Sequence, residues 1–488
     1  MNLYLIGHDY RYAAEQMLLT LFPDERPEYP DGRPTGDRAE LRLMSGTKVT
    51  TVTCVLVYHG QTANGRTSVP NGELTDPAET DRRLQGAVKR AFYRAAMGIG
   101  LPHRPWGMLT GVRPGKLMTP LLAQGLNDAQ AARQFERQYD VSPARADLVV
   151  RTAHATLRAM ESLGEKDVCL YVGIPFCPTR CAYCSFVSQS VEKSMALVPE
   201  FLQALAREIA ATAEAVRRAG LRVVSLYIGG GTPTTLSARQ LDALCTQLAA
   251  AFDLSALREF TVEAGRPDTI TADKLQVLRA HRVDRISVNP QTLDDRVLDT
   301  IGRRHTAQDI YDALCLVRET GGFAVNMDLI AGLPGDTPDG FRATLEQVLA
   351  LAPENVTVHT LSRKRGSNLM AQDAPIPDGA AVGEMLDFAG TVLPRAGYAP
   401  YYLYRQKFMS GGFENVGWTR PGQENLYNIC IMEELCSILA MGGGASTKLV
   451  RPNGGRLERH IDPKYPTEYI ANIDRICAAK AELEAFFQ

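Results

Sequence analysis

The feature that most constrains the fold is a regular alternation of short apolar runs and helix-like stretches between about residues 168 and 361. Six apolar runs have the length of buried strands, at residues 168–174, 223–228, 260–263, 285–288, 325–330 and 356–361. The stretches between them show the 3.6-residue apolar spacing of amphipathic helices. Six such units predict a parallel sheet with helical crossovers. Right-handed crossovers would curve this sheet into a partial (β/α)6 barrel, so the fold class is α/β.

The chain on either side of this alternation has a different pattern. Residues 1–155 contain both β-rich and helix-like segments, which predict an α+β N-terminal domain of unknown role. The barrel domain is expected at residues 165–361. Residues 362–488, with a Tyr-rich stretch and a Gly-rich turn, are expected to form a small C-terminal domain. A chain of 488 residues is long enough for three domains of ordinary size.

Charge and hydropathy exclude several classes of partner. The chain has 53 basic and 55 acidic residues and a formal net charge of −2, so bulk electrostatics gives no reason to expect a nucleic-acid partner. No apolar run approaches the roughly 18 residues needed to cross a bilayer. The N-terminus lacks the basic flank and the apolar stretch of a signal peptide. We therefore expect a cytoplasmic protein that has no membrane or nucleic-acid partner.

Three of the ten cysteines cluster, as Cys177, Cys181 and Cys184, directly after the first expected strand of the barrel. Chemistry in such barrels collects at the C-terminal ends of the strands. Structural zinc requires four ligands, usually from paired C-x2-C knuckles, and no partner pair follows here. Iron–sulfur clusters accept thiolates at loop spacings of this kind. The spacing therefore favours a [4Fe–4S] cluster, whose fourth iron would remain open.

The other cysteines lack the spacing of metal ligands. Several fall in strand-like runs or on helix-like faces, where cysteine behaves as a small hydrophobic residue. We interpret all of them as core or singly placed residues: Cys54, Cys169, Cys245, Cys315, Cys430, Cys436 and Cys477.

Polar and glycine-rich motifs follow the next four expected strands. The string Gly-Gly-Gly-Thr-Pro-Thr at 229–234 allows a ligand to approach the backbone closely. Glu263 ends the third strand, where a carboxylate suits an ammonium group; the alternative is a surface acid in a loop. Gln291 and Asp328 suit ribose hydroxyls, and Arg303 suits a carboxylate through charge-assisted hydrogen bonds.

The cysteine loop, with Tyr183 just before its last cysteine, resembles the signature of the radical S-adenosylmethionine (SAM) superfamily. Over about residues 165–450 the motifs resemble, in order and spacing, those of the oxygen-independent coproporphyrinogen III oxidases. The resemblance implies that SAM chelates the open iron of the [4Fe–4S] cluster and is cleaved to methionine and a 5′-deoxyadenosyl radical. It also implies that the SAM contacts are Tyr171, Tyr183, Gly230, Gly231, Thr232, Glu263, Gln291, Arg303 and Asp328.

Three branches of this family compete. The oxidases proper have a Val-Gln-Ser-type string where this chain has Asn-Pro-Gln at 289–291. The haem-chaperone (HemW-type) branch carries a His-Asn-x-x-Tyr-Trp string, of which only Tyr427 remains here, and Gln423 is a poor haem ligand. The strings at 262–268 and 109–114, with the long N-terminal unit, most resemble the coproporphyrinogen dehydrogenase (HemZ-type) branch.

The resemblance implies oxidative decarboxylation of coproporphyrinogen III propionates to vinyl groups, giving protoporphyrinogen IX in haem biosynthesis. No side chain is then expected to act as a general acid or base. An electron donor such as a flavodoxin or ferredoxin is implied. The alternatives are a haem-binding or haem-trafficking chaperone of the HemW type and a radical SAM enzyme acting on haem.

A porphyrinogen substrate carries propionates, which need cations near the barrel mouth. Arg363, Lys364 and Arg365 follow the sixth expected strand and are the first candidates. Arg113 and Lys116 in the N-terminal unit are weaker candidates. The alternative for either group is a solvated basic surface.

Overall fold

The computed structural model describes residues 1–184, 189–190, 194–362, 375–406, 410–451 and 457–487. These residues form two compact units. The first unit comprises Met1–Val112 and Gln124–Leu148, and the second comprises Arg113–Ala123 and Val149–Gln488. No helix within the described ranges is long and apolar enough to cross a membrane.

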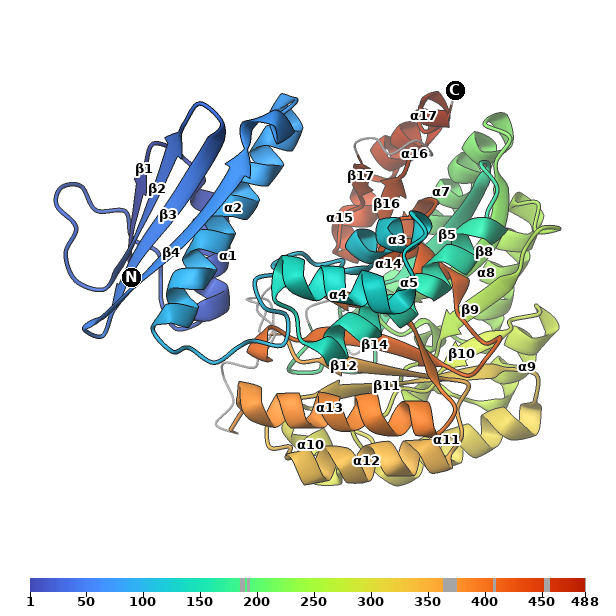
Figure 1. Ribbon diagram of the computed structural model, residues 1–488. Coiled ribbons are helices and arrows are strands. Elements are labelled where there is room, and N and C mark those ends of the chain that lie inside the picture. The colour runs from blue at the N-terminus through green and yellow to red at the C-terminus, as the bar shows by residue number, and fades with distance from the viewer. Residues whose placement is uncertain (185–188, 191–193, 363–374, 407–409, 452–456, 488) are drawn as a thin grey trace. The chain divides into compact units, whose positions relative to one another are not determined.

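The first unit is a four-stranded sheet with helices α1 and α2 packed on one face (Figure 1). Its strands lie in chain order: β1 (Asn2–Ile6), β2 (Arg38–Ser45), β3 (Val49–Tyr58) and β4 (Gln61–Pro70). β1 pairs with β2 in parallel, and the other two pairings are antiparallel. The two helices on the sheet are α1 (Arg11–Leu21) and α2 (Pro77–Gly98), and the segment Gln124–Leu148 adds α4 (Asp128–Tyr139).

Alternation of side chains in β3 explains why this sheet buries one face. Val52, Cys54 and Leu56 are fully buried, with less buried residues between them. α2 begins after Asp76, whose side chain accepts hydrogen bonds from two backbone amides of the first turn. A Cβ at Gly65 would lie 1.9 Å from the Ala91 carbonyl oxygen, so glycine lets α2 lie directly on β4.

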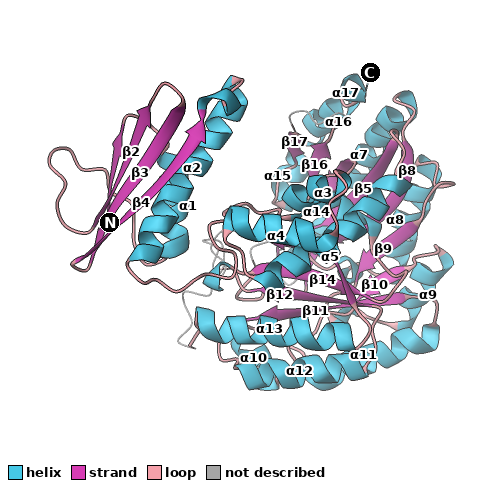
Figure 2. Ribbon diagram, viewed as in Figure 1, coloured by secondary structure: helices cyan, strands magenta, loops and turns pink. Residues whose placement is uncertain are grey.

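The second unit contains six parallel strands that lie in chain order (Figure 2). They are β5 (Asp167–Ile174), β8 (Arg222–Gly230), β9 (Glu259–Glu263), β10 (Arg285–Ser287), β11 (Ala324–Ala331) and β12 (Asn355–Thr360). The main connecting helices are α7 (Val198–Arg218), α8 (Ala238–Ala251), α9 (Ala272–Ala280), α11 (Ala307–Thr320) and α12 (Pro338–Ala350). The predicted α/β class and the six strand–helix units are confirmed.

The parallel strands are buried on both faces, as is typical of sheets covered by helices. In β5, for example, seven of eight residues are buried, and the central one, Tyr171, is partly buried. Each helix presents an apolar stripe to the sheet. In α8 this stripe is Leu241, Leu244, Cys245 and Leu248, and the helix begins in a capping box between Ser237 and Gln240.

C-terminal strands extend this sheet at both edges. β14 (Glu414–Thr419) pairs antiparallel with β12, and β13 (Ala399–Arg405) pairs with β14. At the other edge β15 (Ser437–Gly442) lies parallel to β5, followed by β16 (Ser446–Leu449) and β17 (Glu458–Ile461). The order of eleven strands ends at β13 and β17, so the described sheet is open.

The remaining helices of this C-terminal segment include α13 (Gly379–Arg395), α14 (Leu426–Glu433), α15 (Pro466–Ala471), α16 (Ile473–Ala481) and α17 (Glu484–Phe487). Since residues predicted as a separate C-terminal domain share the sheet of the barrel, the structure groups them with it. A division into three functional domains stays a prediction.

Candidate cluster and cofactor site

The predicted site residues lie at the C-terminal ends of the parallel strands of the second unit. Tyr171 is in β5, and the cysteine loop follows that strand. Gly230 ends β8, Glu263 ends β9, Gln291 follows β10 and Asp328 is in β11. Adjacent parallel strands point in one direction, so these positions gather at one end of the sheet. Their individual roles as ligands remain predictions.

The glycine-rich string after β8 runs against the start of the cysteine loop. The Gly231 amide donates to the Ile174 carbonyl at 2.8 Å, and the Thr232 amide donates to the Phe176 carbonyl at 2.7 Å. A Cβ at Gly231 would lie 2.5 Å from the Phe176 carbonyl oxygen, so the contact requires glycine. Thr232 Oγ1 lies 3.3 Å from Cys177 Sγ.

The rest of the loop is fixed by backbone hydrogen bonds. The Ala182 amide donates to the Ile301 carbonyl at 3.0 Å, and the Cys184 amide donates to the Cys181 carbonyl at 3.1 Å. Cys181 is buried, whereas Cys177 and Cys184 are partly exposed. The three thiols therefore lie on a braced loop, with Cys181 turned inward and the other two partly accessible.

Arg266, which the sequence reasoning did not select, approaches this loop. Its Nη1 lies 2.9 Å from Thr179 Oγ1 and 3.7 Å from Cys181 Sγ. Its Nη2 is buried and has no hydrogen-bond partner among the described residues. The sequence signal was an arginine three residues after Glu263, at the same strand end.

Arg303 occupies the neighbouring position, but its donors are already engaged. Nε and Nη2 lie 3.3 and 3.1 Å from the Tyr183 hydroxyl, and Nη1 donates to the carbonyls of Gly265 and Asn289. Arg303 thus holds Tyr183 and two strand ends together. The direct pairing of Arg303 with a ligand carboxylate stays a prediction, and Arg266 offers an unpaired donor beside it.

His305 adds a second buried group without a partner. It is 4% exposed, and neither ring nitrogen has a hydrogen-bond partner in the described part of the chain. Burial, followed by the nearby charges of Arg303 and Arg266, lowers the pKa of His305 to about 3. The imidazole is therefore neutral at physiological pH, with one donor and one acceptor nitrogen.

Glu263 is partly buried and is not the surface acid of the alternative interpretation. The Tyr227 hydroxyl donates to its Oε1 at 2.7 Å, and the Gly230 amide donates to its Oε2 at 3.2 Å. Burial raises the pKa of Glu263 to about 7, helped by the negative charge of Asp328 and opposed by the bond from Tyr227. Its charge is therefore sensitive to ligands and to pH near neutrality.

Asp328 lies in a polar network across β10, β11 and β12. Asn289 Nδ2 donates to Asp328 Oδ2 at 2.7 Å, and Asn326 Nδ2 donates to Oδ1 at 2.8 Å. His359 Nε2 lies 3.9 Å from Oδ2. Burial acts to raise the pKa of Asp328, but His359 and the hydrogen bonds outweigh it, so the pKa is lowered and the carboxylate stays ionised.

Gln291 is held by backbone contacts to β11. Its amide donates to the Asp328 carbonyl at 2.9 Å, and its carbonyl accepts from the Ile330 amide at 3.0 Å. Its φ of 67° is unusual for a residue other than glycine and reflects this forced position.

Three stacked tyrosines stand behind Glu263. The rings of Tyr227 and Tyr427 are 4.4 Å apart with planes 24° apart, and the rings of Tyr171 and Tyr427 are 5.9 Å apart. Tyr427 comes from α14, so the C-terminal segment contributes directly to this end of the barrel. The sequence reasoning selected Tyr171 but not Tyr227, because it gave no view of which tyrosine faces Glu263.

These residues fit a [4Fe–4S] cluster held by three thiolates. The loop is braced on both sides, and donors from Thr232 and Arg266 lie near two of the sulfur atoms, as expected for groups that tune a cluster. The nitrogens of Arg266 and His305 that have no partner in the described part of the chain leave donors and an acceptor for a polar ligand or water.

Comparison with known proteins identifies the family. Residues 171–348 match the model of the radical SAM superfamily. The oxygen-independent coproporphyrinogen-III oxidase-like protein HemZ of Bacillus subtilis is 39% identical over 422 residues, which cover 84% of each chain. The chain belongs to this HemZ-like family of radical SAM proteins. As a member, it uses a [4Fe–4S] cluster and SAM, as predicted.

More distant relatives of this HemZ-like chain include both enzymes and chaperones. The heme chaperone HemW of Lactococcus lactis is 29% identical, covering 66% of this chain and 80% of its own. The coproporphyrinogen III oxidase HemN of Escherichia coli, a radical SAM enzyme of known structure, superposes with a TM-score of 0.51 at 25% identity, covering 66% of this chain and 72% of its own.

The basic residues predicted to meet propionates are not brought together here. Arg363, Lys364 and Arg365 lie outside the described residues. Arg113 Nη1 forms an ion pair with Glu434 Oε1 at 2.6 Å, and Lys116 pairs with the other oxygen of the same carboxylate. Both weaker candidates therefore already have an acidic partner.

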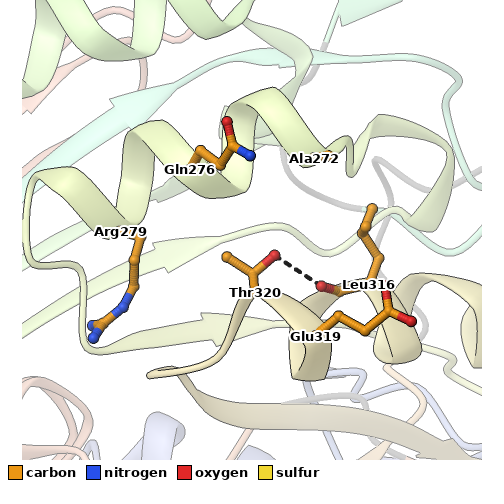
Figure 3. A pocket seen from close by; sticks show the side chains of 6 residues that line it. All are labelled: Ala272, Gln276, Arg279, Leu316, Glu319 and Thr320. Carbon is orange, nitrogen blue, oxygen red and sulfur yellow. Dashed lines mark hydrogen bonds between the residues drawn. The ribbon is translucent and has the colours of Figure 1, made fainter.

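A surface groove of about 410 Å³ lies elsewhere, between α9 and α11 (Figure 3). Its lining includes Gln276, Arg279 and Thr320. Arg279 donates to the Gly322 carbonyl, and Thr320 donates to the Leu316 carbonyl. The groove belongs to the helices outside the sheet and is separate from the strand ends, so we assign it no ligand.

Proposed function

We propose that the protein is a cytoplasmic radical SAM oxidoreductase that converts propionates of coproporphyrinogen III to vinyl groups, with electrons exchanged through a flavodoxin or ferredoxin. The observation that carries this proposal is the extent of the match to HemZ, which covers 84% of both chains. The haem chaperones match a smaller share of this chain.

Cys177, Cys181 and Cys184 would hold the cluster in this proposal, and the strand ends would hold SAM. When bound, the cluster would supply the one-electron chemistry that cleaves SAM and so allows hydrogen-atom removal from a propionate β-carbon. The protein itself orients the reactants and excludes water.

Each polar residue then has a distinct part in binding SAM. Glu263 would accept the ammonium group, whose charge stabilises the ionised carboxylate. Arg266 would bind the carboxylate group through its unpaired Nη2, and Arg303 would keep Tyr183 and the loop in place. Asp328, kept ionised by its network, would accept hydrogen bonds from ribose hydroxyls, and Gln291 would lie beside it.

A haem-trafficking chaperone of the HemW type is the second candidate, because several such chaperones are relatives. The residue at the expected haem-ligand position is Gln423, and its backbone carbonyl accepts hydrogen bonds from Arg285 and Asn355. An amide side chain on a turn fixed in this way gives haem no imidazole to bind.

One anaerobic experiment separates the candidates. The protein is reconstituted with iron and sulfide and incubated with a reductant, SAM and coproporphyrinogen III, and products are analysed by mass spectrometry. We expect 5′-deoxyadenosine together with a product that has lost one CO2 and two hydrogens for each propionate converted. Cys181→Ala is expected to abolish both products, whereas Cys245→Ala, which removes a buried thiol far from the loop, should retain both.

Deoxyadenosine without decarboxylation would contradict the proposed substrate but not the radical chemistry. A parallel titration with haem tests the chaperone hypothesis, which predicts that the Soret band shifts when haem binds. A radical SAM enzyme acting on haem would instead consume haem in the presence of SAM and reductant.

A further inference from the structure

Three cysteines that are far apart in the sequence meet inside the second unit. Cys169 lies in β5, Cys430 in α14, and Cys436 just before β15. β15 pairs with β5 so that Ile438 is opposite Cys169, which brings Cys436 beside the same strand. The sequence gave no reason to group these residues, and the interpretation of them as isolated core thiols is incomplete.

The three sulfur atoms lie within 4.8 Å of one another, and those of Cys169 and Cys436 are 3.6 Å apart. A metal ion about 2.3 Å from each thiolate places the sulfurs about 4 Å apart, so only small shifts are needed. Within the described ranges no other three His, Cys, Asp or Glu side chains, including Cys177, Cys181 and Cys184, gather this closely. The loop thiols have the wider spacing expected when ligands bind different irons of one cluster.

The three thiols are buried in a hydrophobic cluster, with the carboxylates of Glu259 and Asp167 within electrostatic reach. Cys169 and Cys430 are fully buried and Cys436 is 7% exposed, and their neighbours include Val224, Tyr427 and Ile438. In the part of the chain that the structure describes, no fourth ligand of these types joins the group. Soft thiolates in this arrangement select thiophilic ions rather than Mg²⁺ or Ca²⁺.

We propose that Cys169, Cys430 and Cys436 form a closed trithiolate site for one thiophilic metal ion, Cu⁺ or Zn²⁺. On binding, three metal–sulfur bonds replace three S–H bonds, and the three protons leave to solvent without any change of oxidation state. Three-coordinate geometry favours Cu⁺. Zn²⁺ is favoured by charge, because three thiolates with Zn²⁺ carry a smaller net negative charge in the buried site than three thiolates with Cu⁺.

The ion would tie α14 to β5 and β15 behind the cofactor site. Cys430 lies about one helical turn after Tyr427, and Cys169 is two residues before Tyr171. These two tyrosines stack with each other, and Tyr227, the third ring, donates to Glu263. A metal ion at this point would therefore fix the aromatic stack on which the position of Glu263 depends.

The test uses the full-length protein with its iron–sulfur cluster reconstituted, so that the loop cysteines are occupied. Cu⁺ or Zn²⁺ is added anaerobically in separate titrations, unbound metal is removed, and iron, copper and zinc are counted by mass spectrometry. We expect one equivalent of one of the two ions above the iron content. The titration in which the bound metal levels off at one equivalent identifies the ion.

Cys430→Ser and Cys436→Ser are expected to lose this equivalent and to retain their iron, while Cys245→Ser, a buried thiol in α8, should keep both. If a variant fails to fold, an alkylation experiment on the wild-type protein tests the proposal instead. Bound metal should protect Cys169, Cys430 and Cys436 from pulsed alkylation in partly denaturing conditions, relative to Cys54. Binding of neither ion, or metal retained without these cysteines, would overturn the proposal.

Discussion

Arg266 Nη1 lies 3.7 Å from the sulfur of Cys181, so a buried cation contacts the proposed cluster loop. Arg266 is 3% exposed, and its Nε lies 3.2 Å from Asp268 Oδ1. A positive charge and a hydrogen-bond donor next to a cluster sulfur stabilise the reduced cluster, because reduction adds negative charge. The remaining donor, Nη2, is available to a ligand carboxylate.

Replacing Arg266 should therefore affect two separable properties. Arg266→Leu is expected to lower the reduction potential of the cluster and to weaken SAM binding by about tenfold to a hundredfold, the range for losing a hydrogen bond to a charged group. Arg266→Lys should restore part of the potential but little of the SAM affinity, because it keeps the charge and loses the fork of donors. A redox titration followed by electron paramagnetic resonance and equilibrium binding of SAM measure the two effects. An unchanged potential in Arg266→Leu would show that the contact with Cys181 is only structural.

Glu263 should make SAM binding pH-dependent near neutrality. Burial raises its pKa from 4.5 to about 7, so the neutral acid persists up to that pH and the carboxylate dominates above it. If the carboxylate binds the SAM ammonium group, affinity should rise with pH by up to about tenfold per unit below pH 7 and level off above it. Glu263→Gln should bind weakly at every pH and show a flat profile.

Tyr227→Phe provides the matched variant for this profile. The hydrogen bond from Tyr227 lowers the pKa of Glu263, so its loss should move the midpoint to higher pH while leaving the plateau. Equilibrium dialysis with SAM between pH 6 and 9 measures both variants. A wild-type profile without an inflection would exclude Glu263 as the ammonium ligand.

Gly231→Ala should disturb the cysteine loop. The added Cβ would lie 2.5 Å from the Phe176 carbonyl oxygen, and relieving this overlap is expected to cost about 1–3 kcal/mol. We expect a lower iron content after reconstitution and a lower melting temperature. Gly390→Ala in α13 is the control, because its Cβ meets nothing within 4 Å and should stabilise the helix by about 0.5–1 kcal/mol.

A buried ion pair joins α7 to the C-terminal helices. Lys480 Nζ lies 3.0 Å from Glu208 Oε1, both side chains are almost fully buried, and Glu208 Oε2 accepts from the Gly442 amide at 2.8 Å. Lys480→Met leaves Glu208 buried without its cation and should lower the free energy of unfolding by about 3–5 kcal/mol. Urea unfolding of the second unit measures this loss. Glu208→Gln with Lys480→Met should recover part of it, since only Asp462, whose Oδ2 lies 3.3 Å from Lys480 Nζ, is then left without this cation.

The sequence pattern was sufficient to predict the parallel strands and the loops that follow them. The expected strand at 168–174 is β5 with one residue added, and that at 285–288 is β10 with one removed, because apolar periodicity is a local property. The cysteine loop and the glycine-rich string could be found for the same reason, since each is a continuous segment.

Contacts between segments that are far apart in the chain could not be predicted from the sequence. The spacing of residues gives no indication that β15 lies against β5, or that Cys430 and Cys436 meet Cys169. Arg303 was expected to bind a ligand carboxylate, which stays a prediction, but the sequence did not show that its donors also meet Tyr183 and the carbonyls of two strand ends. Arg266 was overlooked because the direction of its side chain is set by the turn after β9.

The pairing of β5 with β15 also constrains the order of folding during synthesis of the chain. Two hundred and sixty-seven positions separate Cys169 from Cys436, so β5 leaves the ribosome long before the strand that covers its edge. Until then the first strand of the barrel has one unpaired edge, and Gly173 and Pro175, just before the cysteine loop, lack their close contacts with Gly442 and Gly443. Cluster insertion into the finished site therefore belongs after synthesis of the C-terminal segment, and premature arrest of translation leaves an aggregation-prone edge.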